Sequence, residues 1–181
     1  ALGIIASVSQ LLVMSMIAIN MASQPIIGYN FGARQFDRVK QTVRNGIVAA
    51  TGIGLFGFLI VQLFPQSIVL LFNSSDKELF DIAVKGLRIF LMLLPLVGFQ
   101  VIAANFFQNI GKAKMATFLS LLRQLIVLVP TLFILPGMFG LTGVWLCSPV
   151  SDLISGIITG AFLWWQLRKL GEENPDRIAG D

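Results

Sequence analysis

The chain has 181 residues, of which 56% are hydrophobic and only 12% are charged. Soluble domains carry about 25% charged residues, so this composition leaves little room for a soluble protein. Three runs, 1–33, 45–75 and 124–151, contain no Asp, Glu, Lys or Arg. Because about 20 mostly apolar residues span a bilayer, the sequence predicts an all-α, polytopic membrane protein.

The net charge of +4 and the absence of histidine restrict the chemistry of the chain. Its basic residues form short clusters beside apolar segments, a pattern typical of topology-setting loops and not of a nucleic-acid groove. The single cysteine, Cys147, lies in an apolar run, which excludes a disulfide framework and a Cys/His metal site. We expect no enzyme activity, no cofactor and no nucleic-acid partner.

Five apolar segments are predicted to form transmembrane helices. They span about 2–27, 39–64, 76–108, 114–135 and 141–170. Pro25 should kink the first helix near its end. Gly46, Ala50 and Gly54 repeat every four residues in the second helix. Small residues at this spacing let helices approach closely in lipid.

Local signals mark the ends of the later helices. Residues 75–78 (SDKE) have the form of a capping box at the start of the third helix, which Pro95 should bend. Pro136 and Gly137 form a turn signal, and Gly140 allows the chain to reverse, so the fourth and fifth helices should form an antiparallel hairpin. Residues 171–181 are predicted to form a polar cytoplasmic tail.

The basic residues divide unequally between the two ends of these helices. One end carries Arg34, Arg38, Lys40, Arg44, Lys112, Lys114, Arg168, Lys169 and Arg177, and the other Lys77, Lys85 and Arg88. The positive-inside rule makes the first end cytoplasmic, which places Ala1 outside and Asp181 inside a bacterial plasma (inner) membrane. Because the chain opens within a helix, without a basic region typical of a signal peptide, we expect further helices upstream.

Two charges lie deep in the last predicted hairpin. Arg123 lies about 14 Å from Lys114 and Asp152 about 16 Å from Leu141, at 1.5 Å per residue. Each charge alone costs about 2.5–3.5 kcal/mol at the bilayer centre, so pairing or a wet cavity is expected. Counting residues does not show whether they touch. Two roles remain open: an internal ion pair that locks the two helices, which we favour, and a site for a coupling cation or proton.

Neutral polar side chains share faces of the first and third predicted helices. At 100° per residue, Asn20 and Gln24 lie within one polar arc, and Gln100 and Gln108 share a face with Asn105 near its edge. Polar side chains in membrane helices face protein or a water-filled cavity. These five residues are candidates for lining a substrate cavity. Ordinary interhelical hydrogen bonding, worth about 0.6 kcal/mol on average, is an equally weighted alternative.

Several motifs occur in the order found in one transporter family. Residues 24–40, QPIIGYNFGARQFDRVK, resemble the junction between the eighth and ninth helices of the MATE (multidrug and toxic compound extrusion) family. Residues 72–100 resemble its ninth-to-tenth loop and tenth helix. SLLRQLIVLVP (120–130) and GLTGVWLCSPVSD (140–152) resemble its eleventh and twelfth helices.

The resemblance implies a secondary antiporter that exports organic, often cationic amphipathic compounds in exchange for H⁺ or Na⁺. The family fold has two six-helix bundles around a central cavity. This chain would supply five transmembrane helices of the C-terminal six-helix transporter bundle. Its partners would be the lipid bilayer, small organic substrates and the missing N-terminal bundle of the same protein. Alone it should not transport, because one bundle cannot enclose the cavity.

The residues that match the family pattern are Pro25, Gly28, Asn30, Gly32, Ala33, Arg123, Pro130, Trp145, Pro149 and Asp152. The resemblance implies chiefly structural roles for them. One branch of the family couples through an acid on the tenth helix, but residues 86–108 contain no Asp or Glu. By its RQ…P and GVW…P-x-x-D motifs the chain resembles the other branch, whose coupling acid lies in the N-terminal bundle.

Two other functions remain open. A lipid or polysaccharide flippase of the same superfamily would be expected to place several cations in its cavity, whereas Arg123 is the one deeply placed cation in the sequence. A non-transporting membrane scaffold subunit would be stable without upstream helices.

Overall fold

The computed structural model describes residues 2–72 and 77–172, and within them every regular element is a helix. The helices are α1 (Leu2–Gly32), α2 (Phe36–Leu63), α3 (Pro65–Phe72), α4 (Lys77–Phe90), α5 (Leu94–Asn109), α6 (Ala113–Leu121), the π-helix η1 (Leu122–Val127) and α7 (Leu128–Glu172). The predicted capping box at 75–78 and the tail beyond residue 172 fall wholly or partly outside this description.

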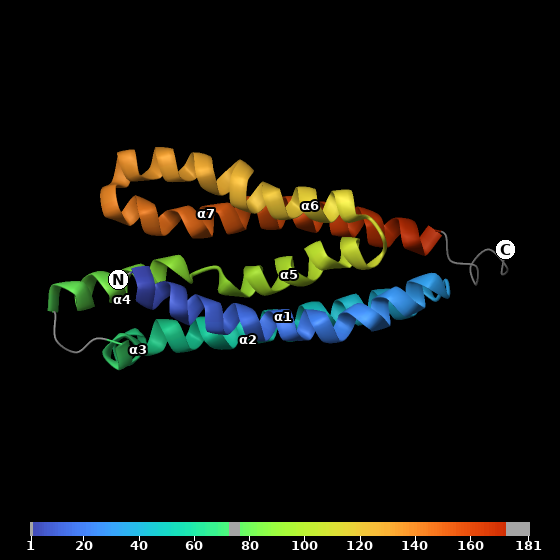
Figure 1. Ribbon diagram of the computed structural model, residues 1–181, viewed down its shortest axis with the longest axis horizontal. Helices are drawn as coiled ribbons and strands as arrows, with labels where there is room; N and C mark the ends of the chain where they lie inside the picture. The colour runs from blue at the N-terminus through green and yellow to red at the C-terminus, as the bar shows by residue number, and fades with distance from the viewer. Residues whose placement is uncertain (1, 73–76, 173–181) are drawn as a thin grey trace.

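The helices form an elongated bundle (Figure 1). In this view α1 and α2 lie along the lower side, α5 runs through the middle, and α6 and α7 form the upper side. The loop from α5 to α6 lies at one end, and α3, α4 and the reversal within α7 lie at the other. This arrangement gives the bundle one end near the basic segment after α1 and an opposite end near α4.

Three described helices are long and apolar enough to cross a membrane: Leu2–Gly32, Phe36–Leu63 and Ala113–Glu172. The bent pair Phe80–Phe90 and Leu94–Asn109 passes the same test jointly, with 48° between its halves. The 60-residue helical segment Ala113–Glu172 reverses at Gly140, and its two arms lie side by side in Figure 1. These spans confirm the prediction of an all-α polytopic membrane protein.

The reversal at Gly140 depends on glycine. Its φ of 56° and ψ of −134° lie in a region of the backbone map that residues with a Cβ rarely adopt. After the reversal the arms approach closely, because a Cβ added to Gly143 would collide with the carbonyl group of Leu135. The reversal thus lies at Gly140, within the turn predicted between Pro136 and Gly140.

Helix bounds differ most from the sequence expectation in the first and third predicted helices. The first helix continues past Pro25 and the predicted end at residue 27, as far as Gly32. The third predicted helix, 76–108, is two helices, α4 and α5, separated by residues 91–93. Pro95 explains the break, because it has no N–H to donate to the carbonyl of Leu91, which instead accepts from the N–H of Leu94 (3.2 Å).

Small residues allow α2 to pack closely against α5, as predicted for its glycine face. A Cβ added to Gly54 would lie 2.8 Å from the carbonyl oxygen of Leu94. On the facing helix, a Cβ added to Gly98 would collide with the carbonyl of Ala50. These are contacts with main-chain atoms, which cannot rotate away, so both positions require glycine for this helix spacing.

Candidate functional site

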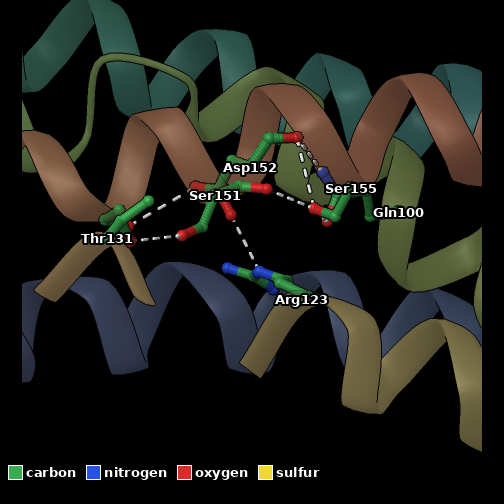
Figure 2. A network of polar contacts seen from close by, with 7 residues as sticks. Gln100, Arg123, Thr131, Ser151, Asp152 and Ser155 are labelled. Atoms are coloured by element: carbon green, nitrogen blue, oxygen red, sulfur yellow. Dashed lines mark hydrogen bonds and ion pairs between the residues drawn. The ribbon is translucent and has the colours of Figure 1, made fainter. Parts of the chain in front are cut away.

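The two deep charges predicted from the sequence form an ion pair. The Nε of Arg123 donates to Oδ1 of Asp152 at 2.7 Å (Figure 2). The Asp152 side chain is 3% exposed, whereas that of Arg123 is 35% exposed. The acid is therefore enclosed by protein, while the arginine side chain is partly exposed.

Arg123 lies in a π-helical turn that the sequence analysis did not anticipate. The turn covers Leu122–Val127, and the N–H of Leu128 donates to the carbonyl of Arg123, five residues earlier. Such turns are rare and occur frequently at functional sites. A π-turn holds more residues than an α-turn, so it changes which residues of the first arm face the second.

Gln100 joins α5 to the peptide that carries the acid. Its Nε2 donates to the main-chain carbonyl of Asp152 at 2.6 Å, and its Oε1 accepts from Oγ of Ser155 at 3.2 Å (Figure 2). Gly156 permits this approach, because a Cβ added there would lie 3.0 Å from Nε2 of Gln100. Gln100, predicted as a lining residue, thus belongs to the same network as the ion pair.

Hydroxyl groups extend the network between the two arms of the hairpin. Oγ1 of Thr131 lies 3.4 Å from Oγ of Ser151, next to the acid (Figure 2). Oγ of Ser148 lies 3.5 Å from Oδ2 of Asp152, a weak contact. The sequence analysis missed these residues, because a lone Ser or Thr in a helix can also bond its own backbone. The sequence offered one clue to these hydroxyl residues: Ser148 and Ser151 lie at about the same predicted depth in the membrane as Arg123 and Asp152.

Two cavities meet at Arg123. The smaller cavity has a volume of about 150 Å³, and its lining includes Gln100, Asn105 and Gln124. The larger cavity has a volume of about 330 Å³, and its lining includes Asp152 and Gln124. Arg123 lines both cavities. Arg123 therefore borders two spaces that both contain polar side chains, and Asp152 borders the larger one.

The predicted lining residues do not all come together. Gln100 and Asn105 line the smaller cavity. Asn20 is buried on α1, and Gln24 and Gln108 are exposed, and these three line neither cavity at Arg123. The structure thus brings together two of the five candidates with the ion pair.

The chain is similar to known membrane transporters. The family model MatE matches residues 1–134. The multidrug export protein MepA of Staphylococcus haemolyticus is 30% identical over 144 residues, which cover 80% of this chain and 31% of MepA. The uncharacterized transporter YisQ of Bacillus subtilis is 25% identical over 143 residues, which cover 78% of this chain and 31% of YisQ.

The chain is also similar to solved structures of MATE transporters. A ligand complex of the MATE multidrug transporter DinF-BH is 37% identical, with a TM-score of 0.83, over 90% of this chain and 36% of that one. An outward-facing MATE family transporter of the MOP superfamily has a TM-score of 0.87 at 20% identity, over 94% of this chain and 39% of that one, a likeness of fold alone. This chain thus spans about a third of the length of these relatives. Because the family model matches well over half of it, the chain belongs to the MATE family of multidrug efflux transporters and covers part of their fold.

Proposed function

We propose that this chain supplies part of the C-terminal bundle of a secondary antiporter that exports organic, cationic and amphipathic compounds in exchange for H⁺ or Na⁺. Support comes from MepA, which is named a multidrug export protein, and from DinF-BH, which is named a multidrug transporter. The observation that carries the proposal within this chain is the ion pair of Arg123 and Asp152 in a membrane hairpin, whose arginine borders two cavities. Ionisable groups at such depth are rare and mark functional or locking positions.

The first role that we propose for the pair is a lock. It joins the two arms of the hairpin, and Gln100 adds α5 to the same point through the carbonyl of Asp152. Alternating access proceeds largely by rocking of one bundle against the other, which requires each bundle to keep its internal packing. The Arg123–Asp152 pair, together with Gln100, holds the two arms of the hairpin and α5 together and so helps the bundle to keep its internal packing.

One observation favours a second role for the same residues. The Arg123 side chain is about one-third exposed and borders both cavities, so it has space to leave the acid. Asp152 would then accept a proton or a monovalent cation in its place. We rank this role second, because the acid's main-chain carbonyl is already held by Gln100 and its carboxylate by Arg123.

We place the principal coupling acid outside this chain. Residues 86–108, which follow the first turns of α4 and include most of α5, contain no Asp or Glu. The polar side chains of this region that line the smaller cavity are the amides of Gln100 and Asn105. Neutral groups of this kind suit a broad substrate surface and cannot themselves exchange a proton at ordinary pH.

The experiment is transport by the complete transporter that contains this chain, reconstituted into liposomes. We expect a fluorescent organic cation to move against its gradient when a proton or sodium gradient is imposed, and to stop when an ionophore collapses that gradient. Movement of a labelled lipid without movement of the dye would favour the flippase instead. Movement of neither, in correctly folded protein, would refute export and favour a scaffold.

A further inference from the structure

A pocket at the end of the bundle near α4 is not used by the proposed transport site. It has a volume of about 380 Å³ and lies between α4 and the second arm of α7. Its lining consists of Ile82, Lys85, Arg88, Ile89, Leu141, Thr142 and Trp145. Both cations are exposed, and they lie at the end where the positive-inside rule requires no positive charge. Membrane topology therefore does not explain them.

Trp145 forms a fixed wall of this pocket. It is buried, and its indole ring approaches the main chain of α4 at Gly86, where an added Cβ would lie 2.9 Å from Cε2 of the ring. Any residue other than glycine would push the ring away. The position of the Trp145 ring is thus fixed by the contact between α4 and α7, and the ring is not free to rotate.

The backbone at Arg88 is also held in place. The break after α4 leaves the carbonyl of Arg88 without its usual helical donor, because the N–H of Met92 donates to Ile89 instead. Nε2 of Gln62, from α2, donates to this carbonyl at 3.0 Å. A cation at the break is therefore anchored through its main chain to a neighbouring helix, while its guanidinium stays on the surface.

No described acidic side chain neutralises this pair of cations. Neither Lys85 nor Arg88 takes part in the ion pairs Arg123–Asp152 and Arg168–Glu172 of the described residues. Asp81, one turn before Lys85 on α4, does not line the pocket. Two cations therefore stand beside aliphatic walls and an indole, an arrangement complementary to an anionic group on an apolar stem.

We propose that this pocket binds an anionic phospholipid of the leaflet at the α4 end. The phosphate would lie between Lys85 and Arg88, and the upper part of an acyl chain would lie along the aliphatic walls. The depth agrees, since Trp145 is five residues from the reversal at Gly140, about 7.5 Å along a helix, and tryptophan favours the interface. The volume falls within the range of about 300–1,000 Å³ for ligand pockets. This proposal does not depend on the function proposed above.

The test uses Trp145 as the reporter. The other two tryptophans, Trp164 and Trp165, are replaced by Phe, and the protein is placed in phosphatidylcholine nanodiscs with increasing amounts of chain-brominated phosphatidylglycerol. We expect Trp145 fluorescence to be quenched at a lower lipid fraction than with brominated phosphatidylcholine. Because each basic residue near a membrane surface strengthens binding of anionic lipid about fivefold, Lys85→Gln with Arg88→Gln should raise the half-quenching fraction about thirtyfold.

The control is a variant with the same loss of charge at the other end, Arg38→Gln with Lys114→Gln, which should quench like the parent. Helical content from circular dichroism checks that both variants fold. Equal quenching by the two brominated lipids, or by parent and Lys85/Arg88 variant, would overturn the proposal. Relief of quenching by millimolar inorganic phosphate would also overturn it, because the site would then take a free anion and not a lipid.

Discussion

Removal of one partner from the Arg123–Asp152 pair should destabilise the bundle unequally. Loss of one member of a buried pair costs about 3–5 kcal/mol, because the remaining charge is left uncompensated. In Arg123→Gln the remaining charge is Asp152, which is 3% exposed, so the full 3–5 kcal/mol is expected. In Asp152→Asn the remaining charge is Arg123, which is 35% exposed and borders two cavities. The loss should then be about 1–2 kcal/mol, close to the largest interhelical hydrogen bonds measured in membranes.

Unfolding of the purified chain in mixed micelles with increasing dodecyl sulfate measures these free energies. The double variant, Arg123→Gln with Asp152→Asn, should be more stable than Arg123→Gln alone, because it removes the unpaired acid. The coupling energy from the double-mutant cycle should exceed about 1.5 kcal/mol. If Asp152→Asn is the more damaging change, or the coupling is below about 0.5 kcal/mol, the structural reasoning is wrong.

Transport by the complete protein then separates the two proposed roles. The exchanged variant, Arg123→Asp with Asp152→Arg, should restore transport if the pair is a lock, since the attraction is symmetric. Loss of transport in a correctly folded exchanged variant would assign Asp152 a direct role. Normal transport in both Arg123→Ala and Asp152→Ala would exclude both roles.

Two further predictions concern glycines, measured by the same unfolding assay. Gly98→Ala should destabilise the chain by about 1–3 kcal/mol, because its Cβ collides with the Ala50 carbonyl, whereas Gly52→Ala, with nothing within 4 Å, should be neutral or stabilising; equal effects would contradict the close α2–α5 contact. Gly140→Ala should cost about 1–3 kcal/mol through backbone strain alone, because its Cβ has open space. Gly137→Ala, which also has open space and no positive φ, is its control, and an equal loss there would refute the strain argument.

The ion pair shows which features of the site can be predicted by counting residues along a helix. The depths of Arg123 and Asp152 follow from the 1.5 Å rise and from a turn near Pro136, and the structure places the two side chains in contact. Contact also depends on the rotation of each arm. The π-turn at Leu122–Val127 sets that rotation for the first arm, and a pattern read at 3.6 residues per turn cannot anticipate it.

Gln100 shows a different limit. Its position on a polar face was evident from the sequence, but its partner is the main-chain carbonyl of Asp152, 52 residues away. Every residue has such a carbonyl, so no sequence pattern identifies the one that is accessible. Close approach of α5 to Gly156 makes this carbonyl the partner.

The sequence by itself determined the class of the protein and the family motifs, because bilayer thickness and the cost of burying charge act on local composition. Tertiary structure alone decided the contact of Gln100 with the Asp152 carbonyl, the two cavities that Arg123 lines and the basic pocket beside Trp145. The physical reason is that these features depend on helix rotation and spacing. Both are set by contacts such as Gly86 with Trp145, between residues far apart in the chain.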